Sequence, residues 1–113
     1  MDIAACRLRL TDHLDEFADE YAPTFQGAGT LTQQLEQLSK VKALLWEHGF
    51  AQWGWPERVG GSGGPAMLRA MVGEEIVARD LVVAGFFSMT ETLAPTLIEF
   101  ASPDVAARFV PRI

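Results

Sequence analysis

Residues 54–64 read GWPERVGGSGG, a loop with five glycines, one proline and one tryptophan between two segments that have helical patterns. Such a loop could cradle phosphate groups, act as a hinge, or form a tight turn. Residues 61–66, GSGGPA, formally fit the G-x-G-x-x-A dinucleotide fingerprint. That fingerprint requires a preceding β-strand, and the segment before the loop has a proline and no strand pattern. The Gly-Lys-Ser/Thr of a phosphate-binding P-loop is also missing, so we favour a turn in which Gly60, Gly61 and Gly63 adopt positive φ.

The segment before this loop carries the clearest helix signals. Residues 30–33, TLTQ, form a capping-box pattern, in which Thr30 and Gln33 satisfy free backbone amides at the start of a helix. Gly49 stands where a left-handed residue ends a helix, and Phe50 can fold back onto the last turn. The predicted buried stripe of this helix comprises Leu31, Leu35, Leu38, Leu45 and Trp46.

Two further helices are predicted, one before the helix that begins at Thr30 and one after the glycine-rich loop. Apolar residues recur at spacings of three or four over residues 3–21, which predicts a helix whose N-cap is either Asp2 or Thr11. After the glycine-rich loop, Pro65 suits a first helical position, and apolar residues follow it at helical spacing.

The C-terminal third predicts two more helices. One carries Phe86, Thr90, Leu93, Leu97 and Phe100 on one stripe, and Pro95 inside it predicts a kink or a restart near Ala94. The other begins with Ser102 as N-cap and Pro103 at the first position, and Pro111 ends it. No segment alternates with a period of two. The sequence therefore predicts an all-α fold, a five-helix orthogonal bundle, with residues 1–113 as a single domain.

The composition excludes several classes of protein. The chain has 49% apolar and 21% charged residues, which is typical of a globular domain. Its net charge of −6 and its scattered basic residues disfavour nucleic-acid binding. Cys6 is the only cysteine, so no internal disulfide can form. No apolar run is long enough to cross a bilayer, and we expect a soluble, cytoplasmic protein with no membrane partner.

The residues that could carry chemistry are few. His13 with Glu16, and Glu47 with His48, are single acid and imidazole neighbours, whereas a metal site needs three or four converging ligands. The consecutive glutamates at 74 and 75 point about 100° apart on a helix and do not form a catalytic pair. From the residues alone we predict no catalytic residue and no metal ligand.

Three stretches in order resemble the N-terminal helical domain of flavin-dependent acyl-CoA dehydrogenases. They are LLWEHGFAQWGWPERVGGSGG (44–64), MLRAMVGEEIVARDL (67–81) and LAPTLIEFASPDVAARFVPRI (93–113), and the match runs over residues 31–113. The tryptophan-rich form looks closer to bacterial members that act on bulky or branched acyl-CoAs. Two departures are Val59, where an aromatic is usual, and FASPD at 100–104, where Phe-Gly-Thr-Glu is usual.

The resemblance implies a function that this chain supplies only in part. The family oxidises acyl-CoA to trans-2-enoyl-CoA with FAD, using a glutamate base in a C-terminal domain and flavin contacts in a middle β-domain. Neither domain is represented here, so we expect no tight FAD binding and no dehydrogenase activity from these residues alone. By position, the candidates for one wall of the acyl pocket are Met89, Thr90, Leu93 and Leu97, which could equally be ordinary core.

The resemblance also implies partners. They are an acyl-CoA substrate, the remaining domains of the enzyme, and further subunits of a homo- or hetero-oligomer. Two alternatives stay open: a domain of a non-catalytic subunit that serves assembly in a mixed tetramer, and a free-standing helical interaction module.

Overall fold

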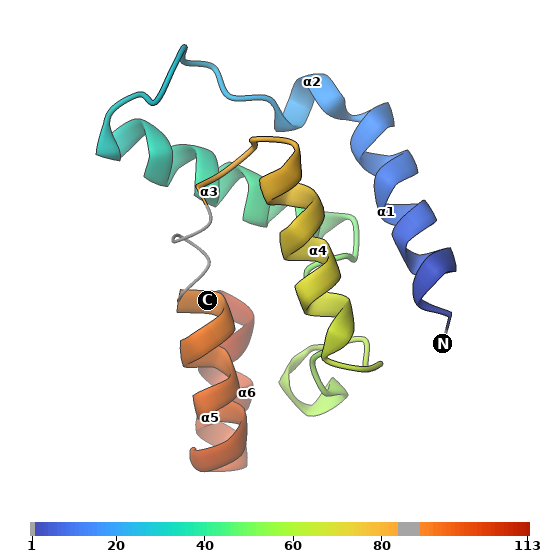
Figure 1. The fold of residues 1–113 in the computed structure, drawn as a ribbon. Helices are drawn as coiled ribbons and strands as arrows, with labels where there is room; N and C mark the ends of the chain where they lie inside the picture. The colour runs from blue at the N-terminus through green and yellow to red at the C-terminus, as the bar shows by residue number, and fades with distance from the viewer. Residues whose placement is uncertain (1, 84–88) are drawn as a thin grey trace.

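The computed structural model describes residues 2–83 and 89–113 (Figure 1), and the side chain of Met89 is not among the described parts. Within these residues no strand forms, and the all-α class is confirmed. Phe86, which the sequence places on the stripe of the fourth predicted helix, lies outside the described residues. The elements in chain order are α1 (Ile3–Glu16), α2 (Ala18–Tyr21), α3 (Leu31–Glu47), the 3₁₀ turn η1 (Glu57–Val59), α4 (Met67–Ala78), the π-helical turn η3 (Met89–Leu93), α5 (Ala94–Phe100), α6 (Pro103–Phe109) and the 3₁₀ turn η4 (Val110–Arg112).

The first predicted helix is divided in the structure. Asp2 is its N-cap, and the carboxylate accepts from the backbone N–H of Ala4 at 2.9 Å. Phe17, with φ −104° and ψ 25°, separates α1 from the single turn of α2. The prediction of one continuous helix over residues 3–21 is therefore wrong, because the helix is interrupted at Phe17. The break turns Tyr21 toward α1, where its hydroxyl lies within hydrogen-bond distance of His13.

The ends of α3 follow the sequence prediction. The capping box is complete, with Thr30 and Gln33 bonded reciprocally. At the other end Gly49 has φ 88°, and the N–H groups of Gly49 and Phe50 donate to carbonyls of the last turn, the pairing of a Schellman motif. Local capping chemistry alone therefore sets both boundaries of this helix.

The buried face of α3 differs from the predicted stripe. Leu31 and Leu35 are 67% and 47% exposed, and Figure 1 shows the first turns of α3 lying beyond α4. Leu45 is buried as predicted, and Leu38 and Trp46 are partly buried against the apolar clusters. The other buried residues of this helix, Gln37 and Val41, were not predicted. Gln37 is drawn inward because its side-chain amide donates to the carbonyl of Tyr21 at 2.7 Å.

The remaining helices begin close to where proline and serine predict. α4 begins at Met67, two residues after Pro65. Around Pro95 the chain passes from the wide π-helical turn η3 into α5 at Ala94, which is the predicted irregularity. Ser102 caps α6 and accepts from the N–H of Val105 at 3.3 Å. α5 and α6 then form an antiparallel hairpin that lies beside the loop preceding α4 (Figure 1), with α6 in contact with η1.

Two separate apolar clusters hold these elements together. The first cluster joins α1 to α4 and includes Trp53 of the loop, and the second is built on Trp55, Val59, Ala94, Ala106 and Val110. Trp53 and Trp55 are two positions apart yet belong to different clusters, and both are at least 95% buried. The loop therefore fastens the hairpin of α5 and α6 to the rest of the fold.

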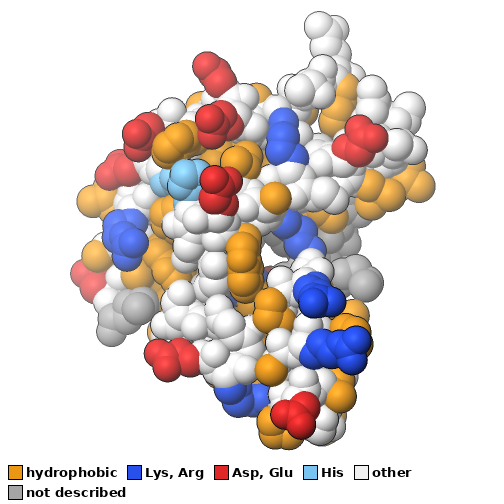
Figure 2. All heavy atoms as spheres, turned by 180° about the vertical axis from the view of Figure 1, so that it is seen from behind, with side chains coloured by type: hydrophobic (Ala, Val, Ile, Leu, Met, Phe, Trp, Pro, Cys, Tyr) orange, Lys and Arg blue, Asp and Glu red, His pale blue; other side chains and the backbone are white. Residues whose placement is uncertain are grey.

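The surface of the hairpin is apolar in places. Figure 2 shows hydrophobic side chains on the lobe that carries α5 and α6 and a hollow between this lobe and the rest. The large apolar residues exposed there are Leu93 (38%), Phe100 (86%), Val105 (41%) and Phe109 (45%). None of the described helices has the length and apolarity that crossing a membrane requires.

Candidate functional site

The glycine-rich loop is a closed turn. The N–H of Gly54 donates to the carbonyl of Gly63, and the N–H of Gly63 donates back to that of Trp55. The N–H of Gly61 donates to the carbonyl of Pro56, and the N–H of Ser62 donates to the carbonyl of Gln52, just before the loop. A phosphate cradle needs free N–H groups aimed outward, and the amides of Gly54, Gly61, Ser62 and Gly63 are already occupied within the turn. The turn interpretation is confirmed.

The glycines of the loop serve two different purposes. Gly60 and Gly63 have φ of 86° and 78°, as predicted. The prediction is wrong for Gly61, whose φ is not positive. A Cβ at Gly61 would lie 2.0 Å from the carbonyl oxygen of Trp55, so glycine is required there because two backbone segments approach closely.

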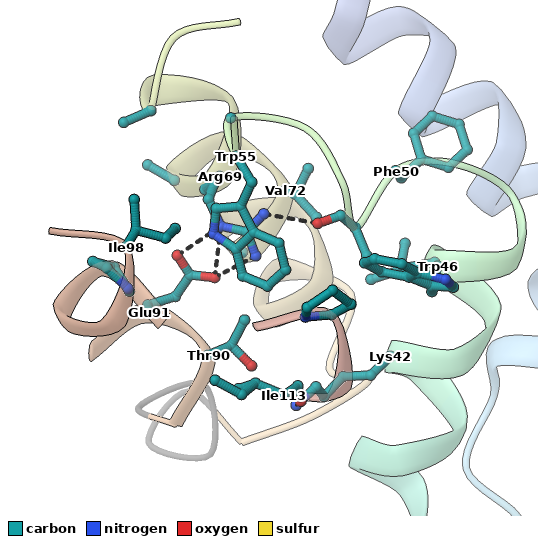
Figure 3. A pocket seen from close by; sticks show the side chains of 18 of the residues that line it. Lys42, Trp46, Phe50, Trp55, Arg69, Val72, Thr90, Glu91, Ile98 and Ile113 are labelled. Carbon is teal, nitrogen blue, oxygen red and sulfur yellow. Dashed lines mark hydrogen bonds and ion pairs between the residues drawn. The ribbon is translucent and has the colours of Figure 1, made fainter. Parts of the chain in front are cut away.

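A groove of about 1470 Å³ separates α3 and α4 from α5 and η4. Figure 3 shows side chains entering it from both walls. Trp46 and Trp55 give it aromatic surface, and Ile98 adds to the apolar lining. Its polar residues include Lys42 and Thr90. Its volume exceeds the roughly 300–1,000 Å³ of typical ligand pockets, so the groove is large enough to hold a small organic molecule or an acyl chain.

One arginine holds the two walls of the groove together. Arg69 of α4, only 12% exposed in its side chain, donates to the carbonyls of Ala51 and Trp53 at 2.7 and 2.8 Å. It also forms a bidentate pair with Glu91 of η3 at 2.9–3.2 Å, drawn as dashed lines in Figure 3. Its guanidinium stacks 3.9 Å above the ring of Trp55. The position of η3, and hence of Thr90, depends on this arginine.

Two buried polar atoms beside the groove have no hydrogen-bond partner in the described structure. They are the Thr90 hydroxyl and the indole N–H of Trp55, in residues that are 6% and 4% exposed. A buried donor without a partner costs about 1–3 kcal/mol. Both atoms are covered by their neighbours, so a molecule in the groove could pair with them after those side chains move aside.

The four predicted wall residues are placed differently. Thr90 lines the groove. Leu93, at the end of η3, and Leu97 do not line the groove: Leu93 is 38% exposed, and Leu97 packs against the second apolar cluster. The backbone of Met89 begins η3, and its side chain is not described. The sequence did not predict Lys42, Trp55 or Arg69 as site residues. For Arg69 a signal was available, because it is an arginine inside the apolar pattern of α4.

A second polar cluster lies apart from the groove, at the junction of α1, α2 and α3. His13 Nε2 lies 2.7 Å from the Tyr21 hydroxyl, and the rings of His13 and His48 are 4.5 Å apart. Burial lowers the pKa of His13, and His48 lowers it further, against the opposite effect of Glu16 and Glu20. Within the described residues no group of three or more His, Cys, Asp or Glu could hold a metal ion.

Comparison with known proteins gives two matches. The family model described as "Acyl-CoA dehydrogenase, N-terminal domain" matches residues 7–113. The protein named acyl-CoA dehydrogenase IpdE1 of Mycobacterium tuberculosis is 33% identical over 101 residues, which is 88% of this chain. The chain spans only 26% of the length of that relative. No solved structure matches the chain.

Proposed function

The chain belongs to the family of acyl-CoA dehydrogenase N-terminal domains, and we propose that it is part of an enzyme that oxidises acyl-CoA to trans-2-enoyl-CoA with FAD. The observation that carries this proposal is the groove, together with the unpartnered Thr90 hydroxyl at its edge. The chain spans about a quarter of its curated relative, so the oxidation itself belongs to a larger protein.

The contribution we assign to this domain is part of the wall around the acyl chain. The residues that we assign to this wall, Met89, Thr90, Leu93 and Leu97, follow one another along η3 and α5. Thr90 lines the groove, and Leu93 and Leu97 lie outside its lining on the same segment. The Arg69–Glu91 pair links η3 to α4 across the groove. An apolar wall excludes water from an acyl chain, and one hydroxyl can orient a carbonyl by hydrogen bonding. Since amides of the glycine-rich loop are occupied within the turn, we assign FAD binding to other parts of the enzyme.

The test uses the full-length enzyme that contains this domain and compares two identical substitutions. Thr90→Val removes the buried hydroxyl, and Thr92→Val removes an exposed one two positions away. A hydrogen bond to substrate worth about 0.5–1.5 kcal/mol predicts a rise of about two- to tenfold in KM, or an equal fall in kcat/KM, for Thr90→Val only.

The acyl-chain profile provides the second measurement. Leu93→Ala and Leu97→Ala should shift the preferred acyl length, because each shortens a side chain assigned to the wall. An unchanged profile in both, together with equal effects of the two threonine variants, would show that this helix does not contact the substrate. Absence of any acyl-CoA oxidation by the full-length protein would favour the non-catalytic assembly subunit.

A further inference from the structure

The described structure gives no internal reason for a glycine at position 73. Among the described glycines, seven have positive φ, and Gly61 is required by the close approach of two backbone segments. Gly73 lies in the interior of α4, and a Cβ built on it meets nothing within 4 Å among the described residues beyond its own helix backbone. Glycine inside a helix is less stable than alanine, so an alanine here would stabilise α4 without a clash.

The open space beside Gly73 belongs to the groove. Gly73 lines the groove together with Ala66 and Ala70, which precede it at the spacing of one helix face. The start of α4 therefore presents to the groove a strip of three small residues, Ala66, Ala70 and Gly73. Only Gly73 has no side chain, so a molecule in the groove can approach the backbone of α4 most closely there.

The Thr90 hydroxyl is a second, independent sign that the groove takes a ligand. Thr90 lines the groove and is 6% exposed, and its hydroxyl has no hydrogen-bond partner in the described structure. Figure 3 shows the Thr90 side chain projecting from η3 into the hollow. A buried polar atom without a partner is costly, and a small shift of the side chains that cover it would let a bound molecule pair with it.

The dimensions of the groove favour an acyl group that is wider than a straight chain. The groove exceeds the volume of typical ligand pockets. A straight chain of methylenes is a thin rod and would leave much of the groove unfilled. A ring or a branch fills more of it and gains apolar contacts with both the strip on α4 and the aromatic side chains of Trp46 and Trp55.

We propose that Gly73 is a specificity-determining residue, which sets how wide an acyl group the groove accepts. The ring or branch of the acyl group rests on the strip of Ala66, Ala70 and Gly73, in space that a larger side chain at position 73 would fill. The inference rests on the proposed function for the thioester class of the substrate. It adds which part of the acyl group contacts α4 and which residue limits its width.

The test uses the full-length enzyme that contains this domain and two acyl-CoAs with the same number of carbons, nonanoyl-CoA and 3-cyclohexylpropanoyl-CoA. Both present the same Cα–Cβ bond for oxidation, and only the second carries a ring. Gly73→Val should lower kcat/KM for the ring-bearing substrate about tenfold or more, through KM, and Gly73→Ala should lower it about threefold, because one methylene in an apolar pocket changes kcat/KM by about 10- to 200-fold. For nonanoyl-CoA both variants should change kcat/KM less than about twofold.

The two variants should retain the fold, because alanine and valine both favour a helix more than glycine does, and a thermal melt checks this. Ala5→Val, at an exposed position of α1 outside the groove, is the control for the side chain introduced. It should leave the preference between the two substrates unchanged. Losses for nonanoyl-CoA that equal or exceed those for the ring-bearing substrate, or no loss for either substrate, would overturn the role of Gly73.

Two thioethers that cannot be oxidised to an enoyl thioester, S-nonyl-CoA and S-(3-cyclohexylpropyl)-CoA, separate this inference from the proposed function. Calorimetry measures the binding of each to the full-length protein and to its Gly73→Val variant. If the variant loses affinity for the ring-bearing thioether alone while the protein oxidises no acyl-CoA, the proposed oxidation fails and the role of Gly73 stands. If the enzyme oxidises nonanoyl-CoA and the Gly73 variants treat both substrates alike, the oxidation stands and the role of Gly73 fails.

Discussion

Gly61→Ala should be among the most destabilising small substitutions in this chain. An added Cβ would lie 2.0 Å from the oxygen, 2.4 Å from the carbonyl carbon and 2.6 Å from the Cβ of Trp55, whereas real Cβ atoms essentially never come within 3.0 Å of such atoms. The loop would have to open by about 1 Å. That shift breaks the bonds from the amides of Gly61, Ser62 and Gly63 to their carbonyl partners. At about 1 kcal/mol for each bond, the free energy of unfolding should fall by about 3 kcal/mol.

Urea unfolding followed by tryptophan fluorescence measures this loss, with two glycine variants as controls. Gly63→Ala meets no atom within 4 Å and suffers only from its φ of 78°, so it should cost about 1 kcal/mol. Gly73→Ala, inside α4 with open space around its Cβ, should stabilise by about 0.5–1 kcal/mol. If Gly61→Ala costs no more than Gly63→Ala, the close approach of the two backbone segments is not what selects glycine at 61.

Three further predictions concern other parts of the fold. Arg69→Lys should lower the free energy of unfolding by about 1–3 kcal/mol, because a lysine cannot bond Glu91 and both loop carbonyls together; a thermal melt no different from that of the parent chain would contradict this. The pKa of His13 is depressed below 6.5 in the fold, so its neutral form stabilises the protein above pH 6.5 and that stability is lost as pH falls through the folded pKa. His13→Phe should flatten the decline in unfolding free energy between about pH 7 and 5. Urea titrations at the two pH values that give the same decline in parent and variant would contradict this role of His13. The isolated chain should self-associate through the exposed apolar side chains of the hairpin and the adjoining Leu93. Leu93→Glu should therefore lower the mass measured by sedimentation, whereas Leu8→Glu, on α1, should leave it unchanged. A parent chain that stays monomeric at high concentration would refute this.

The features that the sequence predicted well are those decided within a few residues. The capping box at Thr30, the left-handed Gly49 and the serine cap of α6 each depend on one side chain and the nearest backbone groups. The buried face of α3 could not be predicted in the same way, because the burial of Gln37 depends on the carbonyl of Tyr21 in another helix.

The site was less accessible to prediction than the fold for the same reason. Arg69 is one of several scattered basic residues in the sequence, and only the folded chain brings Ala51, Trp53 and Glu91 around its guanidinium. The groove itself arises between helices whose order in sequence does not reveal their separation in space. Resemblance to a family drew attention to Thr90, which lines the groove, but not to the lysine or the arginine that also line it.

The division of Trp53 and Trp55 between two clusters bears on how the chain assembles during synthesis. Every buried member of the first cluster lies within residues 6–82, so that cluster is complete in sequence before the hairpin exists. Trp55 and Val59 have their partners Ala94, Ala106 and Val110 more than thirty residues later, since 94 − 59 = 35. Until those residues leave the ribosome, one face of the loop has nothing to pack against, and this interval is when the nascent chain most needs protection from aggregation.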